Sequence, residues 1–246
     1  MKSFETGSCR WLPASIAASL LLATGCGRQP AQAQAAGESD LAPAAIGAAD
    51  ASARNEVLLA SAEPFEALTE QAFTVSSPQL DSLIADARAA ATNAKGVLPS
   101  PLDATVDRQA AEIAAARQSG DRSGLALASV ETYRRLVESQ DPAVLKVPVA
   151  VSLLDYAGFR YDALAQAQVV DWKAMDEAAR FAGDQWQSLA ITMRSKALPG
   201  VMTESIRGMS VAAKRRDPVF ARSAAATELA LVDLIEEQVA NQPRRR

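Results

Sequence analysis

From Glu56 onward, apolar residues recur every three or four positions, which is the spacing of one face of an α-helix. Proline, glycine and aspartate residues divide this pattern into segments, at the places where helices usually start and stop. No segment alternates apolar and polar residues over the length of a half-buried strand. The pattern therefore predicts an all-α protein.

The predicted helices form two sets, which meet near Pro142. Short turns join the helices within each set, and short turns favour antiparallel neighbours. We therefore predict two tandem up-down four-helix units, over residues 56–140 and 143–241. The predicted helix starts are about Glu63, Ser77-Pro78, Ser100-Pro101 and Asp121 in the first unit, and Pro148, Asp171, the break at Leu198-Pro199-Gly200 and Asp217 in the second.

The two sets match each other at offsets of 94 to 100 residues. We interpret this match as an internal duplication, although alanine-rich amphipathic helices can also align by chance. The matched features are residues 65–68 with 161–164, Ser77 with Asp171, Leu98-Pro99 with Leu198-Pro199, Gly120-Asp121 with Arg216-Asp217, and Glu131 with Glu228.

The first 26 residues differ from this helical pattern. Lys2 and Arg10 give a basic start, and the apolar run that follows is about 13 residues long, whereas a membrane-spanning helix needs about 20. This is the layout of a secretory signal. The sequence Leu22-Ala23-Thr24-Gly25-Cys26 resembles the lipobox of bacterial lipoproteins. That resemblance implies removal of residues 1–25 and attachment of lipid to the sulfur of Cys26.

Residues 26–55 are rich in alanine, glutamine, glycine and proline, with few large apolar side chains. Such a segment buries too little surface to fold alone, so we predict a disordered, flexible tether after the lipidated cysteine. Gly27 stands where an aspartate would signal inner-membrane retention in lipoproteins of Gram-negative bacteria. The resemblance therefore implies export and anchoring in the cell envelope, with the outer membrane, facing the periplasm, favoured over the inner. Residues 242–246 form a basic tail.

Composition excludes several kinds of chemistry. The chain has no histidine, which removes Ser-His-Asp hydrolysis and imidazole-bound zinc or haem. Its two cysteines, Cys9 and Cys26, both belong to the signal and lipobox, so no free thiol is expected in the mature chain. Loss of residues 1–25 changes the formal net charge from −4 to −5, which argues against binding nucleic acid. We expect no catalytic residues, no cofactor and no resident metal.

The densest group of unusual residues follows the most apolar stretch of the chain, at positions 155–162. Residues four or five apart lie near one face of a helix, so their polar groups could form the wall of a ligand pocket. Gly158 would allow a helix or ligand to approach closely. The alternative is that these groups satisfy one another where helices cross. The candidate ligand-binding residues are Asp155, Tyr156, Arg160, Tyr161 and Asp162.

Other groups have more ordinary interpretations. Met175, Met193, Met202 and Met209 could bind copper, but they fall at core positions of two helices. The acids around Asp171 begin a helix, where negative charge is favoured. In the last helix the predicted inward residues are Phe220, Ala224, Thr227, Leu231 and Leu234.

These observations favour a lipid-anchored, non-catalytic helical-bundle protein that binds an envelope protein or, weakly, a small ligand. One alternative is a carrier of a small ligand or metal ion in the crevice between the units. Another is an enzyme that uses carboxylates alone. Acid pairs such as Glu131 with Glu138 or Glu228 with Asp233 are too common on helix surfaces to support it, but a buried carboxylate pair would.

Overall fold

The computed structural model describes residues 43–193, 195 and 197–241, and this part of the chain is all-helical, with eight helices and no strand. The predicted signal, Cys26 and the basic tail lie outside the described residues. The helices are α1 (Pro43–Gln71), α2 (Ser77–Ala94), α3 (Leu102–Ser119), α4 (Arg122–Glu138), α5 (Val149–Ala165), α6 (Trp172–Ala190), α7 (Leu198–Arg215) and α8 (Pro218–Ala240).

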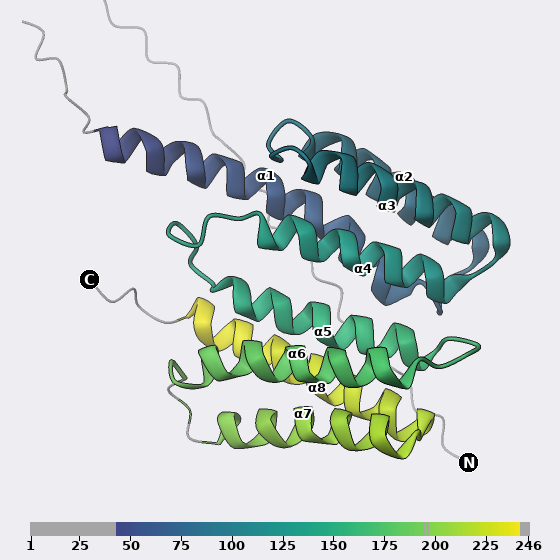
Figure 1. Cartoon of the computed structure of the whole chain (residues 1–246). Coiled ribbons are helices and arrows are strands. Elements are labelled where there is room, and N and C mark those ends of the chain that lie inside the picture. The colour runs from purple at the N-terminus through teal and green to yellow at the C-terminus, as the bar shows by residue number, and fades with distance from the viewer. Residues whose placement is uncertain (1–42, 194, 196, 242–246) are drawn as a thin grey trace, which may run out of the picture. The chain divides into compact units, whose positions relative to one another are not determined.

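The eight helices form two four-helix units, as the sequence predicts (Figure 1). In the first unit α1 packs against α2 and α4, and α3 closes the ring by packing against α4 and, more lightly, α2. In the second unit α5 packs against α6 and α8, and α7 lies against both of these. The two units therefore have the same order of neighbours. Their origin by duplication stays a prediction.

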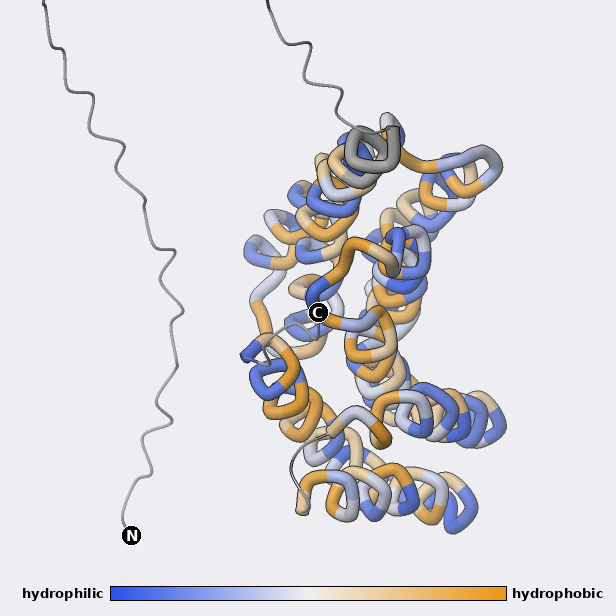
Figure 2. The backbone as a smooth tube through the Cα atoms, turned by 90° about the vertical axis from the view of Figure 1, so that its left-hand side faces the viewer, coloured by the Kyte–Doolittle hydropathy of each residue, from blue (hydrophilic) through white to orange (hydrophobic). Residues whose placement is uncertain are grey.

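Helix α5 is the central element of the fold. It packs against α4 and α1 of the first unit as well as against its own neighbours. Leu153 and Tyr156 belong to the core of the first unit, whereas Leu154 and Tyr161 lie in the two apolar clusters of the second. A helix that is apolar on all sides is a buried helix, which explains why residues 147–165 form the most apolar stretch of the chain. Along the other helices, hydrophobic and hydrophilic residues both recur in Figure 2.

Three aspartates begin helices as predicted. Asp121 accepts from the Gly124 amide at 2.8 Å, Asp171 from the Ala174 amide at 2.9 Å, and Asp217 from the Phe220 amide at 3.0 Å. Each bond satisfies an amide that has no partner within its helix. Helices α3 and α7 each end on a residue in the left-handed conformation, Gly120 and Arg216. The matched turns therefore share one backbone geometry.

The predicted tether is too long at its C-terminal end. Helix α1 begins at Pro43, so residues 43–55, which are predicted to belong to the tether, are helical. Alanine is the best helix former, and the Asn55 side chain anchors this segment by exchanging two hydrogen bonds with the Asp141 backbone, at 2.8 and 2.9 Å. The first unit therefore begins well before Glu56, and α1 continues through Pro64 without a break.

Two helix starts also differ from the prediction. Ser76 rather than Ser77 precedes α2, and the Gln79 side chain accepts from its amide at 3.0 Å. Leu98-Pro99 lies in the turn before α3, whereas Leu198-Pro199 forms the first turn of α7, so this pair of matched residues is not equivalent. Within the described residues, no helix is both long and apolar enough to cross a membrane.

Candidate functional site

The five candidate residues lie on α5, but they do not form one pocket. Because α5 is surrounded, its polar side chains point toward different neighbours. Tyr156 and Arg160 meet α4, and Tyr161 enters the second unit. Asp155 and Asp162 have different charged neighbours again, on α1 and α8. The predicted pocket wall therefore does not form, because Tyr156 and Arg160 share contacts that Asp155 lacks.

Tyr156 and Arg160 share a carboxylate acceptor on α4. The Tyr156 hydroxyl donates to Glu131 Oε1 at 2.8 Å, and Arg160 Nη1 donates to the same oxygen at 2.6 Å. Arg160 Nη1 also lies 2.6 Å from the Tyr156 hydroxyl oxygen. Charge-assisted bonds of this kind are stronger than those between neutral groups. The alternative that these groups satisfy one another at a helix crossing thus holds for this trio.

A second arginine extends this network. The Arg134 guanidinium lies 5.0 Å from the ring centre of Tyr156 and 4.9 Å from that of Phe181, within the range of a cation–π contact. Its Nε donates to Glu138 Oε1 at 2.7 Å. The neighbouring open groove, of about 860 Å³ between α3, α4, α5 and α6, is lined by three arginines and four acids. Positive and negative side chains therefore nearly balance on this side of α5.

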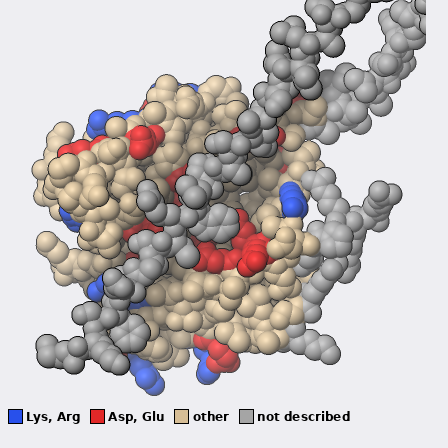
Figure 3. All heavy atoms as spheres, turned by 180° about the vertical axis from the view of Figure 1, so that it is seen from behind, with Lys and Arg blue, Asp and Glu red and all other residues tan. Residues whose placement is uncertain are grey.

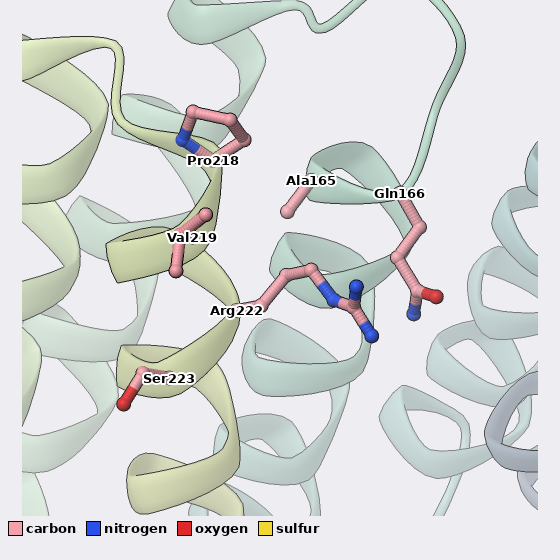
Figure 4. A pocket seen from close by; sticks show the side chains of 6 residues that line it. All are labelled: Ala165, Gln166, Pro218, Val219, Arg222 and Ser223. Carbon is pink, nitrogen blue, oxygen red and sulfur yellow. The ribbon is translucent and has the colours of Figure 1, made fainter.

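Tyr161 and Asp162 have separate surroundings. The buried Tyr161 hydroxyl donates to the Met209 carbonyl at 2.6 Å, which fixes α5 against α7. Asp162 accepts from Gln166 Nε2 at 2.5 Å. Burial raises the pKa of Asp162, against the lowering effects of Gln166 and Arg222. Arg222 extends from α8 toward Gln166 across a shallow pocket of about 660 Å³ (Figure 4).

On the other side of α5, Glu228 of α8 occupies a core position. It has no exposed surface, and neither carboxylate oxygen has a hydrogen-bond partner among the described residues. A Cβ atom on Gly158 would collide with Glu228 Oε2 and with the Leu229 side chain, so glycine is what lets α5 and α8 meet here. Burial raises the pKa of Glu228 well above its ordinary value, and nearby Asp155 adds to the effect.

Asp155, one helical turn before Gly158, connects this buried carboxyl to a larger acidic group. Burial raises the pKa of Asp155 well above its ordinary value, and Glu66, Glu236 and Asp233 raise it further. Burial likewise raises the pKa of Glu66 from 4.5 to about 7, and four acidic neighbours act in the same direction. No positive charge contributes to either shift.

We call this group of exposed and partly buried carboxyls the acidic face. Its side chains come from both units, and none of them forms an ion pair with a described lysine or arginine. Seen from the side opposite to Figure 1, Asp and Glu side chains gather in the middle of the helical part (Figure 3). The acidic face consists of Glu63, Glu66 and Glu70 on α1, Asp155 on α5, and Asp233 and Glu236 on α8.

The predicted alternatives involving metal gain no geometric support. Within the described residues, no three or more acidic side chains are placed to hold a metal ion. Met175, Met202 and Met209 are fully buried core residues, and Met193 packs at the edge of the second core. At the start of α6, Asp171 caps the helix, while Asp176 and Glu177 pair with Arg180 and Lys173.

Comparison of the chain with protein-family models, curated proteins and solved structures gives no match. Sequence reasoning missed Glu66 and did not recognise Glu228 as buried. The signal for Glu228 was present, because buried residues of α8 recur at Ala224, Glu228, Leu231 and Ile235. The predicted inward positions Phe220, Thr227 and Leu234 are instead exposed.

Proposed function

We propose that this protein is a lipid-anchored, non-catalytic protein of the cell envelope that binds a positively charged partner on its acidic face. The lipobox-like sequence ending at Cys26 supports the anchor and the location. The acidic face supports the binding role and the sign of the partner's charge.

The binding role is supported by one observation: no described lysine or arginine forms an ion pair with the carboxyls of the acidic face. Elsewhere in the described residues, several acids on helix surfaces pair with arginines, such as Glu112 with Arg108 and Glu204 with Arg207. On the acidic face, neighbouring carboxyls instead raise the pKa values of Glu66 and Asp155. Like charges held together destabilise a fold. A bound cation would relieve that repulsion, so the arrangement favours a positive partner.

Binding accounts for this arrangement better than catalysis. Partly buried Asp155 and fully buried Glu228 are near enough to interact, as the carboxyl pair of an enzyme using carboxylates alone would be. However, Glu228 has no exposed surface, so a substrate on the acidic face could touch Asp155 but not Glu228. The other acids of the face, which are exposed except for the partly buried Glu66, are distributed over α1 and α8. This distribution suits the attraction of a positively charged partner better than a reaction at one point.

The anchor is tested by labelling growing cells with radioactive palmitate. The wild-type chain should incorporate label and Cys26→Ser should not. Equal labelling of the two proteins would rule out the lipid anchor.

The binding role is tested with a fluorescent oligolysine peptide and the full chain, by fluorescence anisotropy at several salt concentrations. The triple variant Glu66→Gln, Asp233→Asn, Glu236→Gln should lose binding at low salt. A matched triple variant, Glu112→Gln, Glu177→Gln, Glu204→Gln, removes three exposed acids elsewhere and should bind like the wild type. If both variants bind equally well, the acidic face is not the binding surface.

A further inference from the structure

We infer that the acidic face, together with the buried Glu228 beneath it, is a site for a linear polyamine, a small flexible molecule with two or more ammonium groups joined by methylene chains. This inference rests on the proposed function, since it names the chemical class of the positive partner. Three features of the site carry it: the spread of its charges, the position of Asp155, and the unpartnered carboxyl of Glu228.

The charges are spread along a line rather than focused on one point. Glu63, Glu66 and Glu70 follow one another on α1, and at 1.5 Å per residue they cover about 10 Å of the helix. Asp233 and Glu236 are separated by one turn of α8. A divalent metal ion requires several oxygens that converge at bonding distance, and the described acids offer no such group. A chain of separated ammonium groups fits this distribution.

Asp155 lies at the floor of the site. It is partly buried, and acids on both α1 and α8 act on its pKa. Tyr133 of α4 is buried nearby, and the same carboxyls, Asp155 and Glu66, help to raise the pKa of its hydroxyl. A compact cationic group reaches a partly buried carboxyl more readily than a broad one. An ammonium group is a compact point charge with three donors, whereas a guanidinium is a broad plane.

Glu228 provides the second, independent indication of a cationic ligand. Its side chain points from α8 to the face of α5 that carries Gly158 and Asp155, and its two oxygens have no hydrogen-bond partner among the described residues. A buried polar group without a partner costs about 1–3 kcal/mol, so its presence calls for an explanation. An ammonium group at Asp155 would offset the repulsion between the two carboxyls and stabilise negative charge on both.

Proton release should accompany binding. Burial and acidic neighbours keep the carboxyls of Glu66, Asp155 and Glu228 protonated at higher pH than usual, and a bound cation acts in the opposite direction. The groups that face them are Glu63 and Glu70 on α1, Tyr133 on α4, and Asp233 and Glu236 on α8. Affinity should therefore rise as the pH increases through 7.

The test is isothermal titration calorimetry of the full chain with spermidine at pH 7, in two buffers of different ionisation enthalpy. We expect saturable binding with proton release. Asp155→Asn should weaken binding about tenfold, equivalent to about 1.4 kcal/mol, and should reduce proton release. Glu66→Gln provides a second variant at the rim of the site. The control Glu177→Gln removes one exposed acid on α6 and should bind spermidine like the wild type.

The other outcomes separate this inference from the proposed function. If oligolysine binds and responds to the acidic-face variants but spermidine does not, the polyamine assignment is wrong and the binding role stands. Tighter binding of Mg²⁺ than of spermidine would also overturn it, in favour of a metal. If neither spermidine nor oligolysine binds, both proposals fall. Spermidine binding that is unchanged in Asp155→Asn and Glu66→Gln would place the ligand elsewhere.

Discussion

Two glutamates on opposite sides of α5 have opposite environments. Glu131 of α4 accepts hydrogen bonds from Tyr156 and Arg160, and its side chain is 26% exposed. Glu228 of α8 is completely buried, lies against Gly158 and has no hydrogen-bond partner among the described residues. The two residues are 97 positions apart and correspond in the match between the two units. The central helix therefore satisfies one carboxyl and leaves the other unpaired.

The difference lies in what α5 presents to each neighbour. Toward α4 it presents a hydroxyl and a guanidinium, which stabilise an ionised carboxylate. Toward α8 it presents a glycine and, one turn away, another acid, Asp155, which disfavours ionisation. A glutamate at corresponding positions of two similar units is thus a stabilising residue in one unit and a destabilising one in the other. A residue that destabilises the fold without compensation is a candidate for a role in function.

The strongest test of this comparison replaces each glutamate by methionine, which is unbranched and of similar length. Glu228→Met should raise the free energy of unfolding by about 1–2 kcal/mol, because an unpartnered buried carboxyl is removed. Glu131→Met should lower it by about 1–2 kcal/mol, because Arg160 and Tyr156 lose their acceptor. Urea unfolding at pH 7, with unchanged slopes, would measure a difference of about 3 kcal/mol between the two variants. Shifts of the same sign would contradict the comparison.

Gly158→Ala tests the close approach of α5 and α8. The added methyl group would collide with the carboxylate of Glu228 and the side chain of Leu229, so we expect a loss of about 1–2 kcal/mol in urea unfolding. Adding Glu228→Ala should recover part of this loss, because it removes one of the colliding groups. Gly183→Ala is the control, since its methyl group meets only Ile206 at an ordinary distance of 3.9 Å. If the changes in the free energy of unfolding caused by Gly158→Ala and Glu228→Ala were strictly additive, the two residues would not be in contact.

The acidic face should make stability depend on pH. In the folded state the pKa of Glu66 is about 7 instead of 4.5, so the folded chain holds this proton more tightly than the unfolded chain does. The contribution of Glu66 to the free energy of unfolding is therefore fully present below about pH 4.5 and is lost as the pH rises through 7. We expect the free energy of unfolding to fall by about 1 kcal/mol because of Glu66 over this pH range, a figure discounted for the partial exposure of its side chain. Asp155 and Glu228, whose pKa values are also raised, act in the same direction.

Unfolding curves recorded between pH 4.5 and 7.5 would measure how steeply the free energy of unfolding falls with pH, which we call the pH slope. Glu66→Gln should flatten it, because glutamine does not titrate. The control Glu177→Gln makes the same change of charge on α6, away from the acidic face, and should leave the slope as in the wild type. A slope that is unchanged in Glu66→Gln would show that Glu66 does not titrate in this range.

The sequence predicts the parts of this fold that depend on local chemistry. The caps Asp121, Asp171 and Asp217 were predictable because each acts on amides within its own first turn. The tether boundary was not, because Asn55 is fixed by the backbone of Asp141, 86 positions away in the chain. Local composition gives no information on such a distant partner.

The candidate site could be predicted only in part, for the same reason. The unusual composition of residues 155–162 correctly identified α5, and Gly158 does allow a close helix approach. Neither observation tells which neighbour each side chain meets. Asp155 owes its environment to Glu66 and Glu236, which are 89 positions before it and 81 after it. The acidic face exists only because the fold brings α1 of one unit near α5 and α8 of the other.

The smallest test compares the two matched turns that precede α4 and α8. Gly120 and Arg216 both adopt the left-handed conformation, with φ of 75° and 53°, which is unfavourable for any residue with a Cβ atom. Arg216→Gly should therefore stabilise the protein by about 0.5–1 kcal/mol, and Gly120→Ala should destabilise it by about 1 kcal/mol. A methyl group on Gly120 meets no atom within 4 Å, so the second change reports on backbone conformation alone. Arg216→Ala keeps the Cβ atom while removing the charge. If thermal unfolding showed Arg216→Ala to be as stabilising as Arg216→Gly, the cost at this turn would come from the arginine side chain, and the two units would differ in the energetics of a turn whose geometry they share.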